Sequence, residues 1–159
     1  MDNNVLMKIS LAKSAGFCFG VKRAINIALE TAKTYNPVFM LGDIVHNEEV
    51  VKQIQKAGII KINRLSCGEG KILLIRAHGC PNKTLQKAKE FGYKVIDATC
   101  PMVKEIHKIA KNLENNGCQI IVIGDKFHDE VNGIVGQLKH KAIIIDKLKN
   151  IPLKKIKTI

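Results

Sequence analysis

The chain has 159 residues, of which 46% are hydrophobic and 25% are charged, and its formal net charge is +12. This composition excludes intrinsic disorder, and the sequence contains neither a membrane-length apolar run nor a signal-peptide core, so we expect a cytoplasmic protein without a membrane partner. The lysines are dispersed and aromatic residues reach only 4%, which argues against a nucleic-acid partner and leaves an anionic small ligand such as a phosphate ester.

Short apolar runs rich in β-branched residues alternate with amphipathic segments along the chain. In chain order the predicted strands are LMKISLA (6–12), PVFML (37–41), AGIIKI (57–62), KILLIRA (71–77), YKVIDA (93–98), QIIVIG (119–124) and KAIIID (141–146). The spacing of apolar residues predicts helices over 21–32, 47–57, 82–91 and 103–113. Strands that alternate with helices predict an α/β fold with parallel sheets.

Two segments of the chain resemble each other when Cys18 is aligned with Cys100 without gaps. The eight identical pairs, over 29 residues, are Cys18/Cys100, Val21/Val103, Lys22/Lys104, Ile27/Ile109, Ala28/Ala110, Gly42/Gly124, Asp43/Asp125 and His46/His128. Each copy reads strand, Cys, amphipathic helix, strand, Gly-Asp, two residues, His. We therefore predict two copies of one α/β unit, residues 1–96 and residues 97–159.

The two aligned cysteines are the best candidates for reactive thiolates. Cys18 and Cys100 each follow a predicted strand and precede a predicted helix, and a helix N-terminus lowers the pKa of a thiol. Gly16 and Gly20 flank this position, where the lack of a side chain lets the backbone approach a cluster or a phosphate. A cytoplasmic chain with five irregularly spaced cysteines favours thiols or metal ligands over disulfides.

Three histidines are expected beside these cysteines. His46, His78 and His128 each follow a predicted strand, and ligands of parallel α/β units collect at the carboxyl ends of the strands. Two thiolates and three histidines on one rim of a basic protein predict a site for a metal and an anion. Two thiolates complete neither an iron–sulfur cluster nor a zinc site, so the predicted site is one unit short.

The remaining cysteines and histidines have simpler interpretations. Cys67, Cys80 and Cys118 are interpreted as small buried side chains, although Cys80 lies close to the predicted rim. His107 is expected on a helix surface among lysines, and His140 in a lysine-rich turn, so both are expected to be solvated.

Five motifs together resemble one enzyme family, the 4-hydroxy-3-methylbut-2-enyl diphosphate reductases (LytB-type) of the non-mevalonate isoprenoid pathway. The motifs are GFCFGVKRAI, VHNEEVV, RAHG, DATCPMV and HDEVNG, and they span nearly the whole chain in the family's order. The resemblance implies three similar α/β units around a pseudo-threefold axis. Each unit of the family gives one cysteine to a central [4Fe-4S] cluster.

The resemblance also implies roles for individual residues. Cys18 and Cys100 would be two metal ligands of the cluster, and Glu130 would be the catalytic acid that delivers protons. The histidines that would bind the substrate diphosphate are His46, His78 and His128. The implied reaction is a two-electron reductive removal of a hydroxyl group, which gives isopentenyl and dimethylallyl diphosphate with electrons from ferredoxin or flavodoxin.

The sequence also departs from the family pattern. Family members run to about twice this length, so the third unit and its cysteine are absent here, and Asp129 replaces the usual proline between histidine and glutamate. We therefore expect a truncated, inactive or partner-dependent form whose third unit comes from a separate chain. The alternatives are a non-catalytic remnant, a binding module for phosphorylated small molecules, and a thiol redox protein that uses Cys18 and Cys100.

Overall fold

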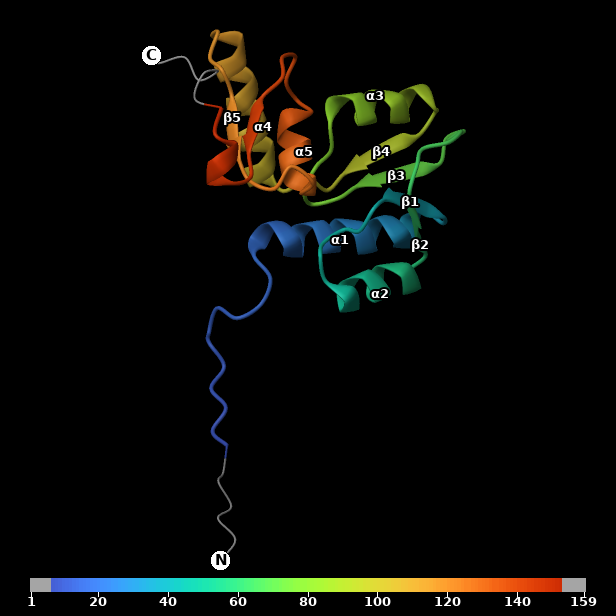
Figure 1. Cartoon of the computed structure of the whole chain (residues 1–159). Helices are drawn as coiled ribbons and strands as arrows, with labels where there is room; N and C mark the ends of the chain where they lie inside the picture. The colour runs from blue at the N-terminus through green and yellow to red at the C-terminus, as the bar shows by residue number, and fades with distance from the viewer. Residues whose placement is uncertain (1–6, 153–159) are drawn as a thin grey trace, which may run out of the picture.

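The computed structural model describes residues 7–152, and their helices and strands alternate along the chain (Figure 1). The elements are α1 (Phe19–Thr34), β1 (Val38–Leu41), α2 (Glu48–Lys56), β2 (Ile59–Ile62), β3 (Ile72–Ile75), α3 (Asn82–Glu90), β4 (Lys94–Asp97), α4 (Pro101–Asn115), β5 (Ile121–Ile123), α5 (Asp129–Val135), β6 (Ile143–Ile145) and the 3-10 turn η1 (Leu148–Asn150). Within the described residues, no helix combines the length and the apolar character that a bilayer crossing needs.

The first four strands form one parallel sheet in the order β2-β1-β3-β4. Helices α1 and α2 cover one face of this sheet and α3 covers the other (Figure 1). The central strand β3 is buried throughout, because Ile72 and Leu74 join the core under α1 and α2 while Leu73 and Ile75 join the core under α3. Burial on both faces explains why this strand reads as a continuous apolar run.

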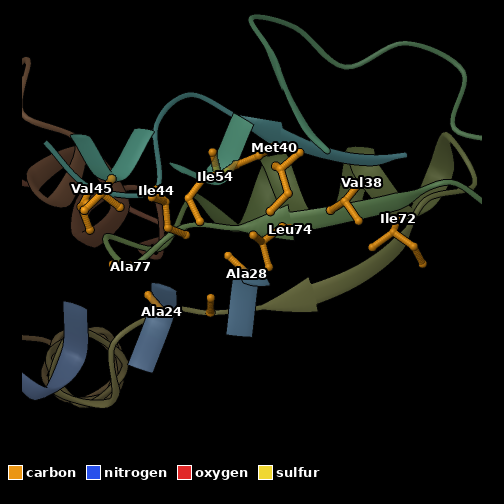
Figure 2. Close-up of a cluster of buried hydrophobic side chains, with 13 residues drawn as sticks. Ala24, Ala28, Val38, Met40, Ile44, Val45, Ile54, Ile72, Leu74 and Ala77 are labelled. Atoms are coloured by element: carbon orange, nitrogen blue, oxygen red, sulfur yellow. The ribbon is translucent and has the colours of Figure 1, made fainter. Parts of the chain in front are cut away.

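The larger core lies between the sheet and α1 (Figure 2). Ala24 and Ala28 of α1 are fully buried, and their small side chains let the helix approach β1 and β3 closely. Ile54 of α2 and Ile44 of the β1–α2 loop fill the same core. This packing holds the start of α1, and with it Cys18, at a defined place relative to the strand ends.

The last part of the chain repeats the order of the first. Strands β5 and β6 pair in parallel, and α4 packs against α5 beside them. The order α1-β1-α2-β2 therefore recurs as α4-β5-α5-β6, and the predicted α/β fold with parallel sheets is confirmed. The expected division between residues 96 and 97 falls at the last residue of β4, three residues before Cys100.

Two predictions about elements are wrong. Residues 7–12 form no strand, and Met7, Ile9 and Leu11 are 83%, 83% and 86% exposed on a segment that runs away from the body (Figure 1). A strand needs a hydrogen-bonded neighbour, and no strand of residues 7–152 lies beside this segment; Leu6 of the same run lies outside the described residues. Helix α5 was not expected, because its seven residues include Gly133, which weakens the helical signal.

Candidate functional site

Three histidines converge at the carboxyl ends of the strands. His46 lies in the loop after β1, His78 follows β3, and His128 follows β5 as the N-cap residue of α5. The ring centroids are 4.8 Å apart for His46 and His78, 5.8 Å for His46 and His128, and 5.9 Å for His78 and His128. The structure therefore brings residues from both sheets into one cluster, which we call the histidine cluster.

Backbone hydrogen bonds connect the loops that carry this cluster. The amide of Ala77 donates to the carbonyl of Ile44 at 3.4 Å, which joins the loop after β3 to the loop after β1. The amide of Cys100 donates to the carbonyl of Ala77 at 2.9 Å. Because Ala77 directly precedes His78, one backbone segment positions both that histidine and the second candidate cysteine.

The two candidate cysteines stand at helix N-termini. Cys18 is the N-cap residue of α1 and is exposed, Cys100 is the N-cap residue of α4 and is half-buried, and both thiols are free. A Cβ atom on Gly20 would collide with the sulfur of Cys100, so α1 begins directly against that thiol. The guanidinium of Arg23 on α1 donates to the carbonyl of Thr99 at 3.2 Å and also holds α1 against the residues before α4.

The surroundings of Cys18 and Gly16 differ from those predicted. Cys18 does not follow a strand, because the segment before it is unpaired. The group that Gly20 approaches closely is the thiol of Cys100, whereas a Cβ on Gly16 would meet nothing within 4 Å. Gly16 is instead required by its backbone, whose φ of 122° disfavours residues with a side chain.

Cys18 and Cys100 have the thiol chemistry that an iron–sulfur cluster requires of its ligands. Both are free thiols at the N-caps of long helices, and Gly20, two residues after Cys18, lies against the sulfur of Cys100. Cys80 is a poor further ligand, because burial raises the pKa of its thiol to about 11, with Asp97 adding to the effect. The remaining cysteines, Cys67 and Cys118, are exposed, so their interpretation as buried side chains is wrong.

An ion pair that the motifs did not reveal lies against the histidine cluster. Arg76 donates to both carboxylate oxygens of Asp129, at 2.8 Å from Nη1 to Oδ2 and 2.7 Å from Nη2 to Oδ1. Asp129 Oδ2 also lies 4.0 Å from Nε2 of His46. The residue that departs from the family pattern therefore enters the site, and the sequence separation of 53 residues explains why no local signal predicted the pair.

The protonation of the cluster is set by its surroundings. Burial lowers the pKa of His78, His46 and Arg76 lower it further, and Asp129 and Glu130 oppose the shift. The amide of Glu130 donates to Nδ1 of His128 at 3.2 Å, so the neutral ring of His128 carries its proton on Nε2. Imidazole N–H groups donate hydrogen bonds to anions, and Glu130 lies beside them as the second residue after His128.

His107 is buried, contrary to the expectation that it is solvated. It is buried on α4, and its ring faces Gly79 and Gly133, where an added Cβ would lie 3.0 Å from Cε1 and 3.4 Å from Nε2 respectively. Its Nε2 atom has no hydrogen-bond partner among the described residues. His140 is exposed, as expected. His107 lies four residues after Val103 and three before Ala110, which are both buried, and this helical spacing was a sign of its inward orientation.

Comparisons with known proteins identify relatives of most of the chain. A family model described as LytB protein matches residues 9–159. The 4-hydroxy-3-methylbut-2-enyl diphosphate reductase of Clostridioides difficile (strain 630) is 41% identical over 144 residues, which cover 89% of this chain and 52% of the relative. The protein of the same name from Wolbachia sp. subsp. Brugia malayi (strain TRS) is 40% identical and covers 95% of this chain and 50% of the relative.

Solved structures show the same relationship. The structure described as (E)-4-hydroxy-3-methyl-but-2-enyl diphosphate reductase, the terminal enzyme of the non-mevalonate pathway, matches with a TM-score of 0.80 at 38% identity, over 91% of this chain and 53% of that chain. The E-1-hydroxy-2-methyl-but-2-enyl-4-diphosphate reductase from Plasmodium falciparum matches with a TM-score of 0.85 at 34% identity, over 92% and 46%. The chain thus spans about half the length of the relatives it matches.

Proposed function

The chain belongs to the LytB protein family, and we propose that it supplies part of an active site that reductively removes the hydroxyl group of 4-hydroxy-3-methylbut-2-enyl diphosphate. The products are isopentenyl and dimethylallyl diphosphate. The observation that carries this proposal is the convergence of three histidines with Cys100, through the hydrogen bond from its amide to the carbonyl of Ala77. If the chain divides into the predicted units, residues 1–96 would supply Cys18, His46 and His78, and residues 97–159 would supply Cys100 and His128.

Cys18 and Cys100 would hold two corners of a [4Fe-4S] cluster. Such a cluster, when bound, supplies electrons and a Lewis acid for the departing oxygen. Because the chain covers about half of its relatives, we propose that residues outside this sequence complete the ligand set, in the same protein or in a partner chain. Ferredoxin or flavodoxin is the proposed electron donor.

The side chains of this chain would bind the diphosphate and move a proton. His46, His78 and His128 would donate hydrogen bonds to diphosphate oxygens, and the Nε2 proton of His128 is already free for this contact. Glu130, as a carboxylic acid, would protonate the hydroxyl oxygen as it leaves. In the balanced reaction the C–O bond breaks, two electrons enter, one proton leaves with the oxygen as water, and a second proton is placed on carbon.

Binding of the substrate tests the role of the histidine cluster. In a calorimetric titration we expect His78→Ala to weaken binding by about 10- to 150-fold, since a hydrogen bond to a charged group contributes roughly 1.5–3 kcal/mol. The matched control is His140→Ala, because His140 is exposed and lies outside the cluster. Equal affinity of the two variants would remove the cluster as the diphosphate site.

A second experiment distinguishes a reductase from a binding module. In a complete homologue that carries these motifs, Glu130→Gln should bind the substrate normally but lose turnover, because the amide cannot supply the proton. Retained turnover would exclude Glu130 as the proton donor. Binding without turnover by this chain, even when the other half of a homologue is supplied, would favour the module for phosphorylated small molecules.

A further inference from the structure

We propose that His46, His78 and Asp129 bind a divalent transition-metal ion of the Zn²⁺ type. One ligand atom from each of the three residues lies within 4.8 Å of the others. Two imidazoles and one carboxylate are a common donor set for such ions, and three protein ligands leave coordination positions open for a further ligand. The site is distinct from the two cysteines and does not depend on the proposed function.

Metal binding requires the three ligand atoms, which lie within 4.8 Å of one another, to move closer together. Ligands of a tetrahedral zinc ion stand about 3.4 Å apart, since each lies roughly 2.0–2.2 Å from the metal. Oδ2 of Asp129 and Nε2 of His46 are 4.0 Å apart. The side chain of His46 is 61% exposed and is therefore free to rotate toward the carboxylate.

Arg76 prepares the carboxylate for this role. Its two hydrogen bonds to Asp129 use one lone pair on each oxygen and hold the carboxyl plane in place. An ionised carboxylate has about four lone-pair positions, so Oδ2 keeps one for a metal. Partners of this kind, which orient a metal ligand from behind, are a regular feature of metal sites.

His78 differs from His128 in the hydrogen bonding of its ring nitrogen Nδ1. Nδ1 of His78 is buried and has no hydrogen-bond partner among the described residues. Nδ1 of His128 accepts the amide proton of Glu130, which leaves the proton of its neutral ring on Nε2. His128 is therefore only a hydrogen-bond donor, whereas neutral His46 and His78 each have one ring nitrogen for the ion and keep one N–H for an anion.

The negative charge of Asp129 affects the binding of an anion at the histidine cluster. Asp129 replaces the proline of the family pattern, and a negative side chain repels an anion bound at the same cluster. A divalent ion between Asp129 and the anion would convert this repulsion into two attractions. This last role, in which the open positions of the ion face diphosphate oxygens, rests on the proposed function, whereas metal binding itself does not.

Co²⁺ is a suitable probe because its visible absorption reports coordination. The titration uses the chain with Cys18→Ser and Cys100→Ser, so that these thiols do not compete, and contains no diphosphate. We expect one Co²⁺ per chain, visible ligand-field bands without the near-ultraviolet bands of thiolate ligation, and displacement by Zn²⁺. Absence of binding, or spectra dominated by thiolate bands, would overturn the proposal.

Replacement of the carboxylate supplies the decisive comparison. Asp129→Pro restores the family residue at the first position of α5, where proline is well tolerated, and should weaken Co²⁺ binding by at least about tenfold. Asp129→Asn keeps the shape of the side chain and should give the same loss if the proline variant folds poorly. His140→Ala should bind Co²⁺ like the parent chain. Unchanged affinity in Asp129→Asn would show that the ion binds elsewhere.

Discussion

His107 illustrates how a single side chain can connect two parts of the site. It reaches from α4 to the backbone of Gly79, directly after His78, and to Gly133 of α5. Burial lowers the pKa of His107, Lys111 lowers it further, and Glu130 and Asp97 raise it less strongly. The neutral ring thus fills the space between the loop after β3 and the helix that carries Glu130, and a proton on this ring would be costly.

The pH dependence of stability follows from this environment. Because the folded pKa of His107 lies below its usual 6.5, the unfolded chain takes up the proton first, and stability falls as the pH drops through this range. His78 acts in the same direction. We expect the melting temperature of His107→Leu to fall less than that of the parent when the pH is lowered from about 8 to about 5. His140→Leu is the control, and equal pH slopes for His107→Leu and the parent would contradict the assignment.

At the scale of elements, the turn after β1 and the start of α5 meet at one side chain. Gly42 has a φ of 79°, and a Cβ at this position would lie 2.5 Å from Nη1 of Arg76. The same guanidinium binds Asp129 at the first position of α5. The turn therefore closes over Arg76 without a side chain, and β1, β3 and α5 are joined through that residue.

A pair of glycine substitutions separates backbone strain from this contact. Gly42→Ala should reduce the free energy of unfolding by about 1–3 kcal/mol from strain alone, with a further loss because Arg76 must move. Gly117→Ala is the matched control, since Gly117 has a φ of 83° and open space around its Cβ position. Chemical denaturation of both variants measures the difference. If Gly42→Ala is no more destabilised than Gly117→Ala, the close approach to Arg76 does not contribute to the loss of stability.

At the scale of the whole molecule, α4 exposes an apolar stripe. Met102, Ile106, Ile109 and Leu113 are 71%, 41%, 49% and 44% exposed, and their spacing places them on one face of the helix. Contiguous apolar surface of this kind marks an interaction site. The chain covers about half the length of its relatives, so this face is where we expect the other half, or a partner chain, to pack.

Self-association should reveal the stripe. When the chain is studied alone, we expect concentration-dependent association in sedimentation velocity, and Ile109→Lys should shift the distribution toward monomer because a charge enters the apolar face. Asn112→Lys adds the same charge at another exposed position of α4 and should change little. A parent chain that remains strictly monomeric at all concentrations would argue against the stripe as an interface.

Much of the site could be predicted from local patterns, because helices, strands and their end residues are determined largely by neighbours in the chain. The period of apolar residues predicts α1, α2, α3, α4 and six of the strands, since helices and strands each present one side to the core at a fixed spacing. The repeat that aligns Cys18 with Cys100 and His46 with His128 indicates related positions in the fold. Parallel strands end on one edge, so His46 and His78 were expected to meet, and their rings lie 4.8 Å apart.

What the sequence by itself determined is therefore the α/β fold and the candidate residues at the strand ends. The tertiary structure alone decided which side chains face each other across long separations, including the 53 residues between Arg76 and Asp129, and the burial of His107. It also decided against the strand at residues 7–12, whose apolar alternation finds no neighbour within the described part of the chain. The physical reason is common to these cases: periodicity reports which side of an element is apolar, whereas ion pairs, burial and strand pairing depend on what the fold places opposite.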